Sequence, residues 1–471
     1  MSWRNLIWLS IVLLLAGLAL YLSRRQGRVV QPLDPAASEL AGAVEAYKLI
    51  QRQAYRPLEP HDANSAAAGG MIRQLDDFCV HIPPGQTRTI ERRLDGELDE
   101  TGLRIARRGD ALVVVGALPG SPAQQAALPA GAEIVRIGDQ PAEFLTLAQA
   151  RSLLEQARRD DLEIEVRHDN RRVVRRIPAA RFQMETVTGL VRRADGGWDH
   201  VLDERRRLAY VRIEEFTSRT PSQLQDAWSR LNKPAGVVLD LRGNPGGALT
   251  VAVEVADRFL EAGLIVRVVG RHERAERFAR AEGTFPDVPL VVLVDEQTAS
   301  AAEIVAGSLQ RHGRAELVGC PTLGKWCVQS PIDLGRALGS AYMTTGEYEL
   351  APTSQPASRP ATQQPTRAAT AMAAATATAA ATVPKGRLRH AGLAPDLFER
   401  LTVAQAERLD QFRLEAKVVA FVAPTTAPAG KSVPRDAQIK KAILKDDRQL
   451  AAAAALLAES SKPVTSKTSD Q

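Results

Sequence analysis

Three short segments of the sequence combine residue types that support acyl-transfer chemistry. The first, Val237 to Gly247, is an apolar run that ends in a turn holding Gly243, Gly246 and Gly247, just ahead of an amphipathic stretch. Adjacent glycines let the backbone turn sharply and expose N–H groups near a helix N-terminus, which suits the binding of an anion or an oxyanion. By itself the segment is more typical of an ordinary strand–turn–helix joint.

The second segment, residues 294–310, places Ser300 where a strand is expected to pass into a helix. Small neighbours leave room for a substrate, and the helix dipole would stabilise negative charge that develops there. The alternative is that the segment only caps the helix, with Thr298 and Glu303 forming a capping box. Taken alone, the capping role is the more common one.

The third segment, residues 318–329, contains Lys325 between Gly324 and Trp326. A lysine held among apolar groups is less readily charged, so its neutral amine can act as a general base. Serine needs such a partner, because its hydroxyl is a poor nucleophile by itself. The common alternative is a lysine whose charged end reaches solvent from a strand edge.

Other nucleophilic or metal-binding arrangements have little support. The histidines form no compact motif with Ser300, which argues against a Ser-His-Asp triad; they are His61, His81, His168, His200, His272, His312 and His390. The cysteines are too few for a disulfide-stapled fold and match no metal-ligand spacing; they are Cys79, Cys320 and Cys327.

Composition sets broad limits on what the chain can be. Its 471 residues are 45% hydrophobic and 25% charged, which excludes a wholly disordered or fibrous protein and allows two or three domains. The net charge of +6 is modest, and no dense Lys/Arg stripe with interleaved aromatics indicates nucleic-acid binding.

The chain begins with an apolar segment, Leu6 to Leu22, which is long enough to cross the roughly 30 Å hydrocarbon layer of a membrane. No small-residue cleavage site follows it, so we expect residues 1–28 to be a retained transmembrane anchor rather than a removed signal peptide. Counting Arg4 against the arginines that follow the segment favours a cytoplasmic downstream side, but by a small margin, and sidedness stays open at this point.

Two regions with different patterns follow the anchor. Residues 36–93 carry helical spacing up to Gln53, which Pro57, Pro60 and an Ala/Gly stretch are expected to interrupt. Residues 94–182 predict a compact β-rich region, with strands at 111–115, 133–137 and 162–166 and a helix at 147–157.

The next region, residues 183–352, alternates short apolar strands with amphipathic helices, which predicts an α/β domain with buried strands. The expected strands are 209–213, 236–241, 265–269, 290–294 and 316–318, and the expected helices are 221–231, 249–261 and 301–312.

The remainder of the chain is interrupted by low-complexity sequence. Residues 353–385 are almost all Ala, Thr, Pro, Gln and Ser, which predicts a disordered insert, and the α/β domain is expected to resume over 386–403. Residues 404–471 complete the chain with linkers and two helical pieces, 402–422 and 446–460, which could dock on the core or mediate assembly.

Taken in order, these segments resemble the carboxyl-terminal processing proteases, also called tail-specific proteases. The resemblance covers most of residues 36–401. It rests on Gly70-Met71 with Leu75-Asp76-Asp77, Gly120-Ser121-Pro122-Ala123 with Pro129-Ala130-Gly131, Asp240-Leu241-Arg242 to Gly247, Ser300 to Ile304, Thr322 to Lys325 with Val328-Gln329, Thr344 to Tyr348, and Pro395-Asp396.

The resemblance implies a multidomain α/β protein with a PDZ domain over 94–182 and a protease core of the ClpP/crotonase-like type. It implies Ser300 as nucleophile, Lys325 as general base and Gln329 as the residue that orients the lysine, without a cofactor or metal. The backbone N–H groups of Ala301 and of Gly246, or of Gly247 in its place, would form the oxyanion hole.

The implied activity is endoproteolysis of proteins at or near their C-terminal regions through an acyl-enzyme. The PDZ domain would bind substrate tails as an added strand, with contributions from Gly102, Leu103 and Ile105. The family acts outside the cytoplasmic membrane, which implies a periplasmic or extracytoplasmic catalytic region on a single-pass anchor. A homo-oligomer is compatible with the sequence, and no nucleic-acid partner is expected.

This sequence departs from the family pattern around the base. Ala302 replaces a serine, and Trp326 replaces a glycine and would desolvate Lys325 or crowd the cleft. Cys327 is also unusual, and we expect Cys320 and Cys327 to be free thiols rather than a pair. An alternative is therefore an idle, membrane-tethered PDZ adaptor, although an idle site has no reason to keep the nucleophile, base and orienting residue together. A small-molecule α/β hydrolase would lack its Gly-x-Ser-x-Gly elbow.

Overall fold

The computed structural model describes residues 40–156, 162–193, 195–271, 274–352, 391–419 and 435–460. The expected anchor (1–28) and the expected insert (353–385) lie outside the described residues. The chain forms two compact units, Met1–Gly70 and Met71–Gln471, and each is considered by itself.

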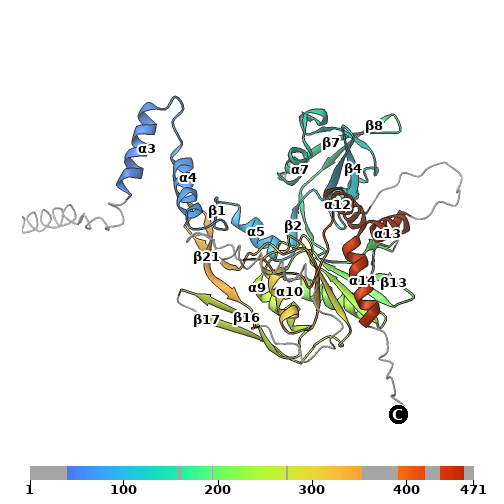
Figure 1. Ribbon diagram of the computed structural model, residues 1–471. Helices are drawn as coiled ribbons and strands as arrows, with labels where there is room; N and C mark the ends of the chain where they lie inside the picture. The colour runs from blue at the N-terminus through green and yellow to red at the C-terminus, as the bar shows by residue number, and fades with distance from the viewer. Residues whose placement is uncertain are drawn as a thin grey trace, which may run out of the picture. The chain divides into compact units, whose positions relative to one another are not determined.

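The first unit contains helix α3 (Ala41–Gln53), which confirms the helical pattern there, and the start of α4 (Pro60–Arg73) (Figure 1). The expected interruption is confirmed between Gln53 and Pro60, a stretch that contains Pro57, but the Ala/Gly stretch does not interrupt a helix, because α4 begins at Pro60 and runs through Gly70. Proline is accepted in the first turn of a helix, where its missing N–H has no intrahelical partner to lose. None of the helices in the described part of the chain is long and apolar enough to cross a bilayer.

In the second unit, a β-rich region confirms the strands and helix expected between 94 and 182. A sheet in the order β3-β4-β5-β7-β8, with β6 beside β5, packs against α7 and encloses a core that includes Leu103, Ile105 and Leu154. The elements are β3 (Leu103–Arg108), β4 (Ala111–Ala117), α6 (Pro122–Ala126), β5 (Glu133–Ile137), β6 (Gln140–Pro141), η1 (Ala142–Phe144), α7 (Leu147–Gln156), β7 (Leu162–His168) and β8 (Arg171–Ile177). The pair β2 (Glu97–Glu100) and β9 (Ala180–Gln183) borders this region.

The α/β alternation produces a largely parallel sheet in the order β10-β14-β15-β18-β19-β22, with β13 beside β14. Its strands are β10 (Val187–Thr188), β13 (Val201–Asp203), β14 (Leu208–Ile213), β15 (Gly236–Asp240), β18 (Leu290–Val294), β19 (Glu316–Gly319) and β22 (Leu397–Phe398), and a small pair is formed by β11 (Val191–Arg192) and β12 (Trp198–Asp199). The predicted strands in this region are confirmed to within a few residues.

Alternate residues of the buried strands face two different helical layers. Val237 and Leu239 belong to a core shared with α8 (Thr220–Ser229), α9 (Leu249–Asp257) and α10 (Ala301–Arg311). Val238, between them, belongs to a second core shared with the C-terminal helices α12 (Val403–Lys417), α13 (Arg435–Asp446) and α14 (Arg448–Ser460). Burial on both sides explains why these strands read as continuous apolar runs.

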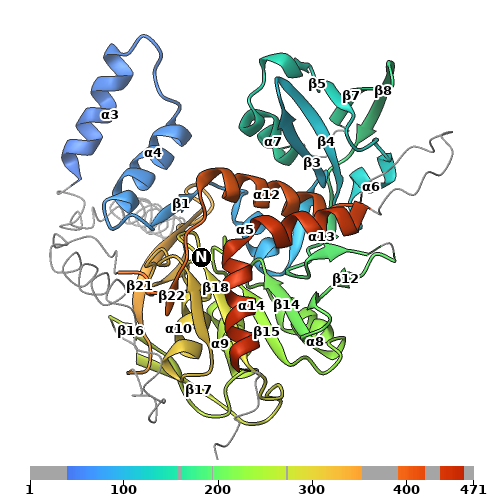
Figure 2. The same cartoon turned by 45° about the vertical axis from the view of Figure 1, so that its right-hand side comes forward.

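The C-terminal helices therefore dock on the sheet, the first of the two possibilities left open by the sequence (Figure 2). There are three described helices there rather than two, because α13 forms within the expected linker. Helix α12 ends at Lys417, earlier than predicted, and Val419 forms an isolated antiparallel bridge with Ala117 at the end of β4.

A second, antiparallel sheet carries the lysine segment. It has the order β1-β21-β16-β17, with β20 beside β21. Its strands are β1 (Val80–Ile82), β16 (Gly263–Gly270), β17 (Arg274–Ala279), β20 (Cys327–Asp333) and β21 (Ser340–Glu349), and the short helix α5 (Thr87–Leu94) follows β1.

Candidate active site

Ser300 lies between the end of β18 and the first residue of α10, as the sequence predicts. Its backbone has φ +54° and ψ −118°, a conformation that is unusual for a residue with a side chain. Such strain persists only where the surroundings impose it, and it is frequent at functional sites. The Oγ of Ser300 hydrogen-bonds the hydroxyl of Tyr348, 2.9 Å away on β21.

Glu303 connects the serine segment to the lysine segment. Its carboxylate is fully buried and accepts four hydrogen bonds: from the N–H of Ser300 (2.8 Å), the N–H of Lys325 (2.9 Å), the N–H of Gly324 (2.8 Å) and the hydroxyl of Thr322 (2.5 Å). Burial raises the pKa of Glu303, although these hydrogen bonds oppose the rise. One side chain thus fixes the backbone of both predicted dyad residues.

This arrangement corrects the expected capping box. Glu303 bonds the N–H of Ser300, which is three residues earlier, and not Thr298. The hydroxyl of Thr298 instead donates to the carbonyl of Leu241, 2.9 Å away. A capping box needs a spacing of three residues, and only Ser300 satisfies it with Glu303.

Lys325 is held by groups from two segments. Its Nζ donates to Oε1 of Gln329 at 2.6 Å and lies 5.3 Å from the centre of the Phe78 ring. The side-chain amide of Gln329 donates to the carbonyl of Phe78, which orients the acceptor oxygen towards the lysine. Within the described residues, Ser300 and Lys325 share Glu303 but no direct side-chain hydrogen bond.

Trp326, which follows Lys325, packs against the hydrophobic core shared with α8, α9 and α10, and its indole N–H donates to the carbonyl of Ala391 at 3.2 Å. The effect of Trp326 on Lys325 stays a prediction; the aromatic ring that the structure places over the Lys325 amine, at 5.3 Å, is that of Phe78. Cys320 and Cys327 are buried free thiols, as expected. Burial raises the pKa of both, that of Cys320 to about 11, which makes them poor nucleophiles.

The glycine turn lies directly against the serine. A Cβ added at Gly246 (φ +105°) would come within 2.9 Å of the carbonyl of Ala299 and 3.0 Å of the N–H of Ala301, so only glycine fits there. The N–H of Gly246 donates to Oδ1 of Asn244 at 2.8 Å, so this expected oxyanion donor is already engaged. Within the described contacts the N–H of Ala301 and that of Gly247 have no such partner.

A buried network of ion pairs stands behind this turn. Arg242 pairs with Asp240 at 2.5 Å and with Asp447, at the start of α14, at 2.8 Å. The side chains of all three are at most 1% exposed. The C-terminal helices thus hold the residue that immediately precedes the glycine turn.

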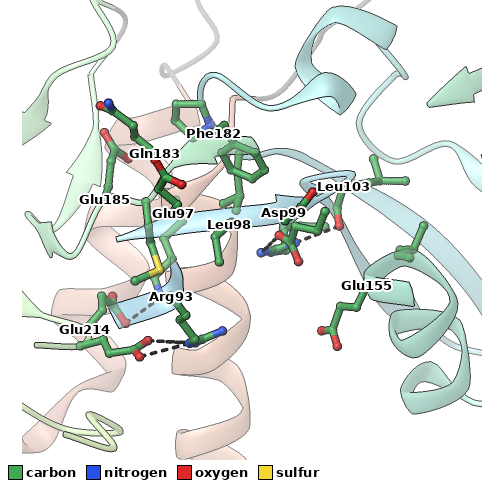
Figure 3. A pocket seen from close by; sticks show the side chains of 18 of the residues that line it. Arg93, Glu97, Leu98, Asp99, Leu103, Glu155, Phe182, Gln183, Glu185 and Glu214 are labelled. Carbon is green, nitrogen blue, oxygen red and sulfur yellow. Dashed lines mark hydrogen bonds and ion pairs between the residues drawn. The ribbon is translucent and has the colours of Figure 1, made fainter. Parts of the chain in front are cut away.

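A cavity of about 710 Å³ extends beside the glycine turn, where Gly243 and Pro245 line it, to β3 and α7. Leu103 and Ile105 form part of its wall, whereas Gly102 is not among the described residues that line it. A Cβ at Gly102 (φ +74°) would lie 2.1 Å from that of Ser121, so this glycine serves the turn. Figure 3 shows the charged and apolar side chains that β2 and β9 add to the cavity, among them Glu97, Leu98 and Phe182.

Four residues of this region make contacts that the sequence did not predict: Phe78, Glu303, Tyr348 and Asp447. Glu303 could have been found from its three-residue spacing to Ser300. Contacts that bridge distant segments, such as Phe78 to Lys325 and Tyr348 to Ser300, leave no local signal. In the described part of the chain, no cluster of three or more His, Cys, Asp or Glu is arranged to hold a metal ion.

Comparisons with known proteins identify the family of the chain. Residues 207–397 match the model of peptidase family S41. The chain is 33% identical over 301 residues to a carboxyl-terminal-processing protease of Picosynechococcus, covering 62% of this chain and 70% of the relative. It is 30% identical over 308 residues to a carboxyl-terminal-processing protease of Synechocystis, covering 64% and 70%.

Among solved structures, the photosystem II D1 C-terminal processing protease is similar at 23% identity and a TM-score of 0.41, covering 77% of this chain and 93% of that one. The sequence relatives place the chain among the serine-type peptidases. Within that class, it belongs to the carboxyl-terminal-processing protease family of peptidase family S41.

Proposed function

We propose that this chain cleaves proteins at or near their C-terminal regions through a Ser300–Lys325 dyad. The observation that carries the proposal is that the backbone N–H groups of Ser300 and Lys325 both donate to the carboxylate of Glu303. This shared acceptor brings together a serine at the start of a helix and a lysine from the segment that leads into the antiparallel sheet. The hydrogen bond from Lys325 to Gln329 adds an orienting contact at the amine.

In this mechanism the neutral amine of Lys325 takes the proton of Ser300 as Oγ attacks the scissile carbonyl carbon. The N–H of Ala301, at the N-terminus of α10, stabilises the oxyanion together with the glycine turn. Because the N–H of Gly246 is bonded to Asn244, we assign the second donor to Gly247, or to Gly246 after Asn244 moves. Lys325 then protonates the leaving amine, and water releases the acyl group.

The β-rich region of residues 94–182 is proposed to act as a PDZ domain. An extended substrate tail would add to β3, where Leu103 and Ile105 line the cavity opposite α7. The support for this role is the continuity of the cavity with Gly243 and Pro245 in the glycine turn. A tail held at β3 would lead the preceding residues of the substrate towards Ser300.

The proposed location is the outer side of a cell membrane. Residues 1–28 would serve as a single-pass anchor, with the catalytic region in the periplasm or another extracytoplasmic space. The length and apolar character of Leu6 to Leu22 support the anchor. The family relationship supports the sidedness.

The test uses the full chain incubated with an unfolded protein that has an apolar C-terminus. Mass spectrometry of the fragments compares the intact protein with Ser300→Ala and Lys325→Ala. Cleavage by the intact protein alone is the expected result. Equal cleavage by all three contradicts the dyad, and cleavage by none, with retained binding of the tail, favours the tethered adaptor.

A further inference from the structure

The contact between Tyr348 and Ser300 has no part in the Ser-Lys mechanism described above. Tyr348 is 8% exposed and lies near the end of β21. Its hydroxyl is 2.9 Å from Oγ of Ser300, which is a side-chain hydrogen bond to the proposed nucleophile. A buried phenol normally satisfies its hydroxyl, and here it does so on a reacting atom.

The backbone places Tyr348 next to the base as well as the nucleophile. Its N–H donates to the carbonyl of Trp326, the residue after Lys325, at 2.9 Å. Its ring belongs to the core that contains Ala301 and Ala302 of α10. Tyr348 is therefore fixed on both sides, and its hydroxyl has little freedom to leave Ser300.

The surroundings of the phenol favour the neutral form. Burial raises the pKa of Tyr348 to about 12, and the nearby Glu303 and Cys327 contribute to the rise. A neutral phenol keeps a proton to donate throughout the neutral pH range. A serine hydroxyl has two lone pairs and one proton, so it can accept from the phenol while its own proton is directed to an amine.

We propose that Tyr348 is a further catalytic residue, whose phenolic O–H donates to Oγ of Ser300 and stabilises that oxygen whenever it carries negative charge. The proposal rests on Ser300 being the nucleophile of the proposed function. It adds a donor on the nucleophile itself, distinct from the N–H groups that face the substrate oxyanion.

The proton balance of the reaction is unchanged by this donor. In acylation, the Oγ–C bond forms, the C–N bond breaks, and the serine proton passes through Lys325 to the leaving amine. In deacylation, water adds to the acyl carbon, its proton passes through Lys325 to Oγ, and the C–Oγ bond breaks. Tyr348 keeps its own proton in both steps, and its donation matters most when Oγ departs.

The test compares the full chain with Tyr348→Phe, Ser300→Ala and a matched control, Tyr342→Phe. Tyr342 lies on the same strand, six residues earlier by number, and pairs with Val80 and Pro331. A fluorophosphonate probe labels reactive serines, and intact-mass spectrometry gives its rate. Turnover and acyl-enzyme are measured with a peptide that ends in an apolar tail, and thermal unfolding checks the fold.

Loss of a hydrogen bond to a charged oxygen predicts that Tyr348→Phe lowers kcat roughly 10- to 100-fold, with a lower KM where the acyl-enzyme accumulates. We expect slower labelling of Ser300 and a larger acylated fraction during turnover, with wild-type behaviour in Tyr342→Phe. Labelling and turnover by Tyr348→Phe at the wild-type rate or faster overturn the proposal. If Ser300→Ala still cleaves, or the probe labels another residue, the proposed nucleophile itself is wrong, and Tyr348 loses its role with it.

Discussion

Two fully buried carboxylates of the protease core, Asp240 and Glu303, are stabilised in opposite ways. Both have side chains that solvent does not reach. Asp240, at the end of β15, is surrounded by cations, whereas Glu303, in α10, is surrounded by neutral donors. The difference separates a carboxylate that holds the fold together from one that arranges a reaction site.

Asp240 is compensated by charge. It pairs with Arg242 at 2.5 Å and with Arg212 at 3.2 Å, and accepts a hydrogen bond from Tyr210 at 2.7 Å. Burial opposes its ionisation, but the two arginines hold the pKa of Asp240 well below its usual range. A buried ion that loses its partner is costly, so each member of this network depends on the others.

Glu303 is compensated by hydrogen bonds alone. Three backbone N–H groups and the hydroxyl of Thr322 reach its two oxygens. Burial is the larger influence, and the pKa of Glu303 is raised. Its role is to position two residues, because its hydrogen bonds hold the backbone of Ser300 and that of Lys325.

The largest expected effect follows from removing the cation that the first network shares. Arg242→Met leaves Asp240 and Asp447 buried without their main partner, which should cost about 3–5 kcal/mol in the free energy of unfolding. Urea unfolding followed by circular dichroism measures the loss, with the surface variant Arg206→Met as control. A loss no larger than that of the control would mean that burial of this network does not govern stability.

The ionisation of Glu214 is expected to have a smaller effect on stability than the loss of Arg242. Glu214 belongs to the charge-compensated region, because its carboxylate lies 2.8 Å from Arg212 and 2.8 Å from Lys417. Burial would raise its pKa, but these cations lower the pKa of Glu214 to about 2 from 4.5. Below 4.5 the unfolded chain binds the proton first, so stability from this group is present above pH 4.5 and is lost as pH falls towards 2.

Glu214→Gln should therefore remove part of the acid-induced destabilisation in that window. The free energy of unfolding, measured by urea at several pH values, should fall less steeply for the variant than for the wild type below pH 4.5. If the free energy of unfolding fell equally steeply with pH for the variant and the wild type, Glu214 would not be the group that takes up the proton.

The second carboxylate is tested by Glu303→Gln. An amide offers one oxygen where four donors converge, so at least one N–H loses its acceptor, at about 1–3 kcal/mol. The kcat should fall at least roughly 10-fold, since small displacements of catalytic groups are costly. Glu254→Gln, on the exposed side of α9, is the control in both assays.

The sign of the pH dependence at Glu303 is the reverse of that at Glu214. Because its folded pKa is raised, the folded protein holds this proton to a higher pH than the unfolded chain does. Stability from Glu303 is thus lost as pH rises from 4.5 through its folded pKa, and the glutamine variant should lack this loss. A loss of equal size in the variant would exclude Glu303 as its source.

The strands and the dyad candidates could be predicted from the sequence because each depends on residues that lie close together in the chain. Buried parallel strands such as β15 and β18 read as apolar runs, and Ser300 follows one of them directly. Two contacts could not be predicted in this way: that of Asp447 with Arg242, which spans 205 residues, and that of the Phe78 ring with Lys325. Those contacts depend on how helices and sheets dock, and no spacing encodes that.

Helix α13 shows the same limit in secondary structure. The stretch between the two expected helical pieces contains Thr, Pro and Ala and predicts a linker, yet Arg435–Asp446 is helical. Ile439 and Ile443, four residues apart, are buried in the core beneath the C-terminal helices. Two apolar positions are a weak periodic signal, and tertiary packing supplies the rest of the stability.

The smallest expected effect on stability comes from a solvent-exposed ion pair with short hydrogen bonds. Arg167 makes two hydrogen bonds of 2.7 Å to Glu133 in the β-rich region, but the two side chains are 49% and 39% exposed. Solvent screens such a pair and side-chain entropy opposes it, so Glu133→Gln should leave the urea midpoint unchanged within error. A loss comparable to that of Arg242→Met would mean that short hydrogen bonds, rather than burial, decide what an arginine–carboxylate pair contributes here.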